Sequence, residues 1–252
     1  MLGFTQVKEV AVGADMTVIS EAEEYVEKVE HGDQKLLTSS CCPAFVATVK
    51  RHAPALADCI SDTVSPMVAR SKAVKHNDPG AITVFVGPCI AKKVEAREHP
   101  DEIDYSLTFE ELKCMMDSQG INPAELEPED FQPDSSADGC SFPQEAGVSK
   151  AVNDYTEKFH DITVNSHYCN GLEECLKALK DYQDGKLDIK YLEGMACVKG
   201  CLNGPGSLTE PGLTRVLLKR FADTTKVKCA GDNDFAQNEV KHVDMERVYL
   251  RK

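Results

Sequence analysis

The chain has 252 residues, of which 42% are hydrophobic and 28% charged, values ordinary for a globular protein with a substantial core. The formal net charge of -14 argues against nucleic acid as a partner, because a phosphate backbone would be repelled. No apolar run approaches the roughly 18–20 residues of a membrane span, and residues 1–8 lack the features of a signal peptide. We therefore expect no membrane span and a cytoplasmic location.

Strands and helices alternate along the chain, which is typical of the α/β class. A turn at 13–15 is expected before a helix that follows the capping-box pattern of Ser20 and Glu23. The expected strands are 9–12, 36–38, 81–86, 105–107, 162–164 and 189–192. The expected helices are 20–30, one from Pro43, one from Pro66 to 75, one from Pro88, 108–119 behind a second capping box, 148–159, 170–185 and 211–221. We expect two lobes of mostly parallel sheet flanked by helices, 1–105 and 106–252, with the functional site between them.

The run 81–86 is continuous in apolar and β-branched residues, which predicts a strand covered on both faces. It leads to Cys89, at the strand end where open α/β sheets usually place their sites. If Pro88 starts a helix, Cys89 and Lys92 lie one turn apart on the same face. Residues 122–139 are rich in Pro, Glu, Asp and Ser, which is typical of a surface insertion. The pattern of the last thirty residues, which are polar and mixed in charge, predicts no role.

Eleven cysteines are many, and without a secretion signal they favour metal binding or redox chemistry over a disulfide framework. Cys197 and Cys201 are four residues apart, so on a helical turn they share one face. Six scattered cysteines are expected to be buried thiols: Cys59, Cys114, Cys140, Cys169, Cys175 and Cys229. Two of these, Cys169 and Cys175, look like a pair, but their spacing matches no ligand pattern.

Cysteines follow three of the expected strands. Four of them could act together as thiolate ligands: Cys42, Cys89, Cys197 and Cys201. Four thiolates suit either zinc or a 4Fe-4S cluster, and the cluster is preferred because no pair of close Cys-x2-Cys knuckles is present. Adjacent side chains of an extended backbone point to opposite sides, so Cys41 and Cys42 are expected to face different surroundings. Cys41 then lies beside the cluster without being needed by it.

Three segments around these cysteines occur in a specific order: TSSCCP at 38–43, GPCIAKK at 87–93 and MACVKGC at 195–201. Together they resemble the three signature motifs of the FeFe (iron-only) hydrogenases, over a match of about 13–204. The resemblance implies an H-cluster, which is a 4Fe-4S cubane joined to a diiron subsite with CO, cyanide and azadithiolate, inserted by hydrogenase maturation proteins. It also implies an anaerobic enzyme that reversibly reduces protons to dihydrogen with electrons from ferredoxin or a similar carrier.

The resemblance further implies which residues hold the cofactor. The metal ligands are Cys42, Cys89, Cys197 and Cys201. The last of these, Cys201, also bridges to the diiron unit. Lys92 hydrogen-bonds a cyanide, and Met195 of the third motif lies at the cofactor.

A proton path is implied in the same way. Cys41 is the free thiol that passes protons to the bridging amine. Glu21, Glu24 and Ser61 stand at the family's relay positions, and the expected order is Glu24, Glu21, Ser61, a water and Cys41. From composition alone, the two glutamates are instead typical of solvated helix carboxylates.

The sequence departs from the family pattern at several places. Gly87 replaces a methionine near the distal iron, Phe45 a tryptophan, and Lys28 an arginine at the surface mouth of the proton path. Residues 204–207 replace a glycine-rich segment, so we expect a divergent subgroup. Family members usually have a further stretch upstream, so either the chain is a fragment or a missing upstream segment or partner subunit completes the site.

Three other functions compete with a hydrogenase. A hydrogen sensor with low turnover would carry the same cluster, and the departure at Gly87 favours it slightly. An iron-sulfur assembly protein would carry only the 4Fe-4S cluster, and the presence of Cys41, Lys92 and both relay glutamates argues against it. The third is a zinc-stabilised α/β protein.

Overall fold

The computed structural model describes residues 2–127 and 134–247, so part of the expected insertion at 122–139 and the last residues of the chain lie outside the description. Its helices are α1 (Ala11–Tyr25), α2 (Pro43–His52), α3 (Pro66–Asn77), α4 (Lys92–Glu98), α5 (Phe109–Ser118), α6 (Ala137–Ser141), α7 (Gly147–His160), α8 (Leu172–Gln183), α9 (Pro211–Thr224) and α10 (Asp234–Val240). Its strands are β1 (Leu37–Thr38), β2 (Val84–Gly87), β3 (Tyr105–Thr108), β4 (Ser166–Asn170) and β5 (Tyr191–Met195).

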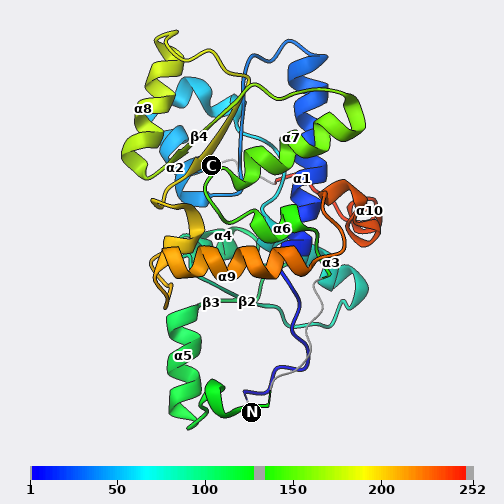
Figure 1. The fold of residues 1–252 in the computed structure, drawn as a ribbon, viewed down its shortest axis with the longest axis vertical. Coiled ribbons are helices and arrows are strands. Elements are labelled where there is room, and N and C mark those ends of the chain that lie inside the picture. Colours follow the sequence, from blue (N-terminus) through cyan, green and yellow to red (C-terminus); the bar gives the residue numbers. More distant parts are fainter. Residues whose placement is uncertain (1, 128–133, 248–252) are drawn as a thin grey trace.

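The strands form two parallel sheets. The larger has the order β1-β5-β4, and the smaller pairs β2 with β3. Figure 1 shows the larger sheet in the upper half of the molecule and the smaller one in the lower half. The expected α/β class with parallel sheets and flanking helices is confirmed. Each sheet contains strands from both sides of the expected boundary near residue 105. The division into lobes 1–105 and 106–252 stays a prediction.

Strand β5 is the centre of the larger sheet and is buried on both faces. Tyr191 and Met195 belong to a core shared with α1, α3 and α7, whereas Leu192 belongs to a second core with α2 and α8. This alternation follows from the two-residue period of a strand. In Figure 1 the two helix pairs lie on opposite sides of the sheet, α2 and α8 on one side and α1 and α7 on the other.

The N-terminal expectations are wrong. No strand forms at 9–12 and no turn at 13–15, because α1 already begins at Ala11. Short apolar runs do not distinguish a strand from a buried helix, and here the helix is buried along most of its length. Gly13 lies inside the helix because α3 approaches closely: an added Cβ would lie 2.2 Å from the carbonyl oxygen of Pro66.

Several local signals are confirmed and others are not. Pro43 and Pro66 each open a helix, and Thr108 with Glu111 forms a complete capping box. The strand at 81–86 shortens to β2 and is only partly buried, so the expectation of two covered faces is wrong there. The strand expected at 162–164 forms later in the chain, as β4.

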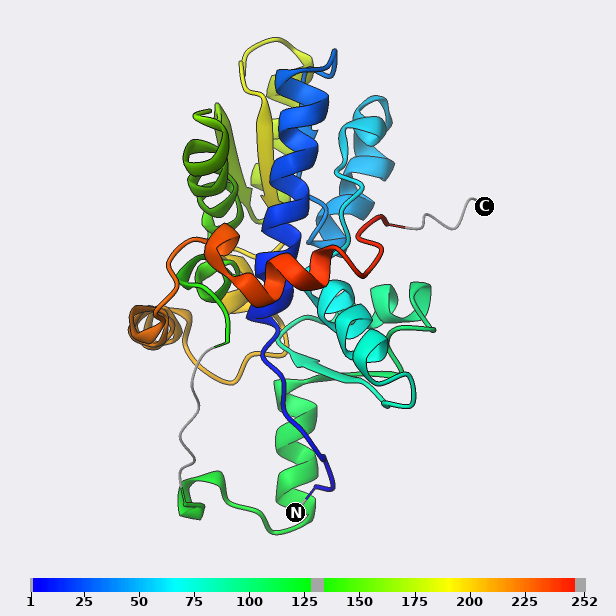
Figure 2. The same ribbon diagram turned by 90° about the vertical axis from the view of Figure 1, so that its right-hand side faces the viewer.

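The C-terminal region, which received no role from the sequence, packs against α1. Asn233 donates from Nδ2 to Oδ2 of Asp15 at 2.7 Å, and the backbone N–H of Ser136 donates to the same oxygen at 2.7 Å. Burial raises the pKa of Asp15 to about 6. Figure 2 shows α10 crossing beside α1. The buried carboxyl therefore connects α1, α6 and the segment before α10.

The contact of α1 with α3 predicts a sensitive position. Gly13→Ala should lower the free energy of unfolding by about 1–3 kcal/mol, because the new methyl group would overlap the Pro66 carbonyl. The measurement is urea unfolding followed by circular dichroism. Gly80→Ala is the matched control, since its added Cβ would meet only the Asp78 side chain at 3.6 Å. Equal stability of the two variants would contradict this packing.

Candidate functional site

The four predicted thiol ligands come from three loops that follow strands. Cys42 lies beyond β1, Cys89 beyond β2, and the other two, Cys197 and Cys201, beyond β5. Burial, and after it the charges of Cys42 and Cys89, raise the pKa of Cys197 to about 11. The pKa of Cys201 is raised by burial first and then by the charges of the other three thiols. The fold therefore brings these cysteines close enough together that the charge on one thiol changes the pKa of another.

The thiols do not form a site for a single ion. Among residues 2–127 and 134–247, no three His, Cys, Asp or Glu side chains are placed to hold one metal ion. Four thiolates are a ligand set that suits a 4Fe-4S cluster as well as zinc.

The backbone around the thiols is closely packed. The N–H of Ala196 points to the sulfur of Cys42 at 3.5 Å, and the N–H of Cys201 donates to the carbonyl of Pro143 at 2.9 Å. Gly200 has φ of +70°, and an added Cβ there would lie 2.7 Å from the Pro143 oxygen. The left-handed conformation and the close approach both require glycine. The loop of the third motif is thus fixed against the loop before α7.

Lys92 places a cation beside the thiols. It begins α4, so the helix expected from Pro88 starts four residues later. Its Nζ donates to Oε2 of the buried Glu95 at 2.5 Å and to the carbonyl oxygen of Cys41 at 3.0 Å. Burial raises the pKa of the Cys42 thiol, and the charge of Lys92 opposes that rise. A fixed ammonium group at this position favours an anionic guest.

Cys41 is buried in different surroundings from Cys42, as expected. Cys41 belongs to the core that contains Tyr191, whereas Cys42 packs against the core of α2 and α8. Burial raises the pKa of the Cys41 thiol well above its ordinary value, and the charge of Glu21 is the next cause. The thiol therefore keeps its proton at neutral pH.

Glu21 is fully buried on α1. Tyr191 donates its hydroxyl hydrogen to Oε1 of Glu21 at 2.5 Å, and within the described part of the chain Oε2 has no hydrogen-bond partner. Burial raises the pKa of Glu21 to about 8. A carboxyl group in this state can hold and release a proton near neutral pH.

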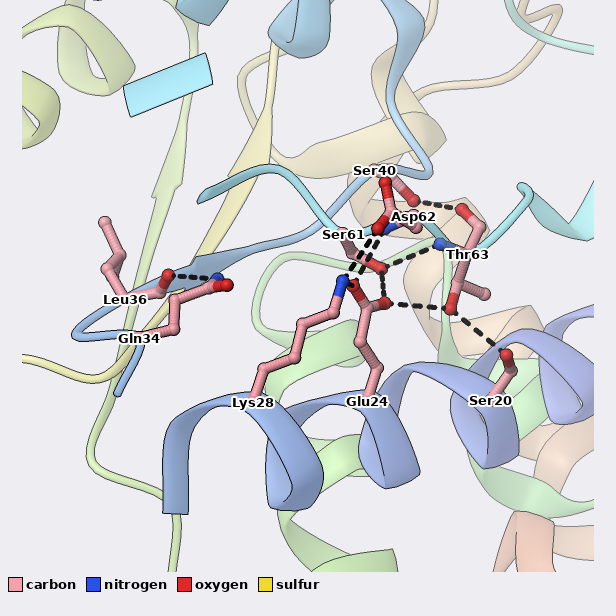
Figure 3. Close-up of polar contacts among 9 residues, drawn as sticks. All are labelled: Ser20, Glu24, Lys28, Gln34, Leu36, Ser40, Ser61, Asp62 and Thr63. Atoms are coloured by element: carbon pink, nitrogen blue, oxygen red, sulfur yellow. Dashed lines mark hydrogen bonds and ion pairs between the residues drawn. The ribbon is translucent and has the colours of Figure 1, made fainter. Parts of the chain in front are cut away.

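Glu24 lies one helical turn beyond Glu21, at the centre of a polar network (Figure 3). Ser61 donates from Oγ to Oε2 of Glu24 at 2.5 Å, and Thr63 donates to the same oxygen at 3.1 Å. The segment 60–63 reaches this place because the N–H of Ser61 donates to the carbonyl of Thr38, beyond which the chain runs to Cys41. The observed contacts place Ser61 directly beside Glu24, which differs from the expected order with Glu21 between them.

The outer end of the network is charged and exposed. Lys28 contacts Oε1 of Glu24 at 2.8 Å and Oδ2 of Asp62 at 2.7 Å. Partial burial lowers the pKa of Lys28, but its hydrogen bonds to Asp62 and Glu24 outweigh that effect and raise it. The side chain of Asp62 is 52% exposed, whereas that of Glu24 is 9% exposed. The polar network thus extends from solvent to Glu24, one helical turn from the buried Glu21.

Sequence reasoning missed three contributors to this arrangement: Asp62, Thr63 and Tyr191. Asp62 and Thr63 directly follow Ser61, so proximity in the chain could have suggested them. Tyr191 carried no such signal, because an aromatic residue in a buried strand is usually a core residue.

One departure from the family pattern, Gly87, has a local explanation. The ring of Phe85 lies where a side chain at Gly87 would be, 2.5 Å from an added Cβ. The ring of Phe45 likewise lies 2.2 Å from the Cβ position of Gly194. In each case an aromatic ring fills the space beside a glycine, so neither Gly87 nor Gly194 can be replaced by a larger residue without repacking.

Comparison with known proteins identifies the family. The family model described as the iron only hydrogenase large subunit, C-terminal domain, matches residues 1–205. The chain belongs to this family. None of the described helices is long and apolar enough to cross a bilayer.

Two curated hydrogenases are similar to the chain. Iron hydrogenase 1 of Clostridium pasteurianum is 28% identical over 249 residues, which cover 81% of this chain and 43% of that protein. The periplasmic Fe hydrogenase large subunit of Nitratidesulfovibrio vulgaris is 24% identical and covers 86% of this chain, and 62% of its own length is matched. The chain thus spans less than two thirds of either relative.

Other similarities point to the fold and to a second class of relative. FeFe-hydrogenase HydA1 from Chlamydomonas reinhardtii, in a variant form, superposes with a TM-score of 0.77 at 19% identity, covering 97% of this chain and 81% of that one. The cytosolic Fe-S cluster assembly factor NAR1 of Meyerozyma guilliermondii is 30% identical over 133 residues, 46% of this chain and 25% of its own length. The chain is therefore similar to proteins of two different functions.

The raised pKa of Glu21 predicts a pH-dependent stability. Below about pH 4.5 the carboxyl is protonated in both states. Between pH 4.5 and 8 only the unfolded chain loses its proton, so the free energy of unfolding falls as pH rises. Each unit of pKa difference corresponds to about 1.4 kcal/mol.

Glu21→Gln should remove this dependence, so the variant should gain stability relative to the natural protein between pH 5 and pH 8. Urea unfolding at both pH values measures it. Glu23→Gln is the control, because its carboxyl is half exposed. A stability difference between Glu21→Gln and the natural protein that stays constant with pH would contradict the assignment.

Proposed function

We propose that the chain is the catalytic region of an FeFe hydrogenase, which reversibly reduces protons to dihydrogen with electrons from ferredoxin or a similar carrier. Two observations support the proposal. Ser61 donates a hydrogen bond to Glu24 on α1, and one helical turn away the buried Glu21 has a raised pKa, as does the buried thiol of Cys41 next to Cys42. An electron-transfer site alone would not need such groups.

The residues present fit an H-cluster. Cys42, Cys89, Cys197 and Cys201 would hold the 4Fe-4S part, and Lys92 and Met195 would contact the diiron unit that maturation proteins insert. When bound, the cluster supplies electrons and the centre at which protons are reduced. Cys41 holds a proton at Sγ, Glu21 holds one at its carboxyl group, and burial excludes bulk water from both.

Replacing single cysteines tests the ligand set. Alanine at Cys42, Cys89, Cys197 or Cys201 should lower the iron and sulfide bound by the anaerobically purified protein, because a cluster that loses one thiolate is released more readily. Cys59→Ala is the control, since this half-buried thiol lies in the core of α2 and α8. Iron and sulfide analysis with the visible absorption spectrum measures the outcome. Full cluster content in any of the four variants would remove that residue from the set.

Cys41→Ala tests the proton path. Hydrogen evolution with reduced viologen should fall by on the order of 100-fold or more, because a positioned proton donor contributes about that much to a rate. Cluster content and the infrared bands of CO and cyanide should stay unchanged. Activity equal to that of the natural protein would refute the role of this thiol.

A second function is favoured by the relatives named as assembly factors. In that case the chain would carry only the 4Fe-4S cluster and take part in iron-sulfur assembly. Infrared spectroscopy after treatment with maturation proteins separates the two proposals: CO and cyanide bands with hydrogen evolution support the hydrogenase, and their absence from cluster-loaded protein supports the assembly factor. Normal bands with very low turnover would instead support a hydrogen sensor.

A further inference from the structure

Tyr191 contacts the proposed relay at Glu21, whereas Ser61 contacts it at Glu24. It lies in β5, 170 residues along the chain from Glu21, and its hydroxyl reaches Oε1 of that carboxyl at 2.5 Å. Both side chains are fully buried. The carboxyl of Glu21 makes this hydrogen bond through Oε1. Its other oxygen, Oε2, has no hydrogen-bond partner within the described part of the chain.

The tyrosine is held in a fixed place. Its backbone pairs with Leu37 of β1 and Ser166 of β4, so strands confine it on both sides. Its ring packs edge-on against Tyr25, with ring centres 6.1 Å apart and an interplanar angle of 82°. Burial raises the pKa of the Tyr191 hydroxyl well above its ordinary value, so the group remains a hydrogen-bond donor at all working pH values.

A carboxyl group in a proton relay has two equivalent oxygens and a rotating terminal torsion. A donor fixed to one oxygen removes that freedom, because the donated hydrogen occupies Oε1 and a proton on the carboxyl must then reside on Oε2. The same bond stabilises the ionised carboxylate, which lets a buried acid release its proton at a lower pH than burial alone would allow.

We propose that Tyr191 is a positioning residue for the proton relay: its hydroxyl orients the Glu21 carboxyl so that Oε2 carries the mobile proton. The inference rests on the proposed function, but the contact itself can be tested without hydrogen turnover.

The other ionisable groups around Glu21 do not lower its pKa as the hydrogen bond from Tyr191 does. Burial is the main cause of its raised pKa, the Tyr191 bond opposes it, and the charges of Glu24 on α1 and Glu193 on β5 raise it further. Cys41 is a neutral thiol on the same side of the sheet. Burial and the charges of Glu24 and Glu193 disfavour the ionisation of Glu21, so Tyr191 is the group that limits the rise of its pKa.

The test compares Tyr191→Phe with the natural protein, both loaded with cluster. Infrared difference spectra follow the C=O band of the protonated Glu21 carboxyl against pH, with the band assigned by its loss in Glu21→Gln. The midpoint should be near 8 in the natural protein and higher by about one unit in Tyr191→Phe, with the band at higher frequency. Hydrogen evolution should fall about tenfold, with the KM for the electron donor unchanged.

Tyr25→Phe is the matched control. Tyr25 is buried, touches the same ring and donates to Glu30 at 2.6 Å, so it tests the loss of a phenol without loss of the relay contact. The Glu21 band and midpoint should stay unchanged in Tyr25→Phe. An unshifted midpoint in Tyr191→Phe, or an equal shift in the control, would overturn the inference.

If Tyr191→Phe does not fold, ring-labelled tyrosine in the natural protein gives the same information. The C–O stretch of one tyrosine should shift as Glu21 titrates and should not shift in Glu21→Gln. Absence of that shift overturns the inference. If the natural protein evolves no hydrogen but the band shifts as expected, the proposed function fails and the positioning contact stands.

Discussion

The properties of the candidate site depend on the burial of ionisable groups around strand β5. The carboxyl of Glu21, the phenol of Tyr191 and the thiol of Cys41 share a region from which water is excluded, and an isolated charge there would cost several kcal/mol. These groups therefore keep their protons. Burial thus raises the pKa of Glu21 and of Cys41, which supports the proposed proton relay.

The fold produces this environment by covering one central strand on both faces. Tyr191 and Met195 point toward α1, and Leu192 points toward α2 and α8. Cys197 and Cys201 lie in the loop after β5, at the C-terminal end of a parallel strand, where open α/β sheets usually place their sites. The strand thus contains Tyr191, which contacts Glu21, and leads to two of the four proposed cluster ligands.

The chain is similar both to hydrogenases and to assembly factors, so the fold alone does not determine the activity. The proposal of a hydrogenase rests on groups that a simple cluster carrier would not need. The polar network from the exposed Asp62 to Glu24, one helical turn from the buried Glu21, supports the proposed movement of protons. The buried Cys41, next in the chain to Cys42, supports the same proposal.

The sequence by itself determined the α/β class, the proline-started helices and the three cysteine motifs, because each of these is encoded in a few neighbouring residues. It could not determine that residues 9–15 are helical, since only the approach of α3 to Gly13 explains a glycine there. The contact of Tyr191 with Glu21 and the position of Ser61 beside Glu24 were decided by tertiary packing. These pairs join residues 37 to 170 positions apart, and no local pattern encodes a hydrogen bond over such distances.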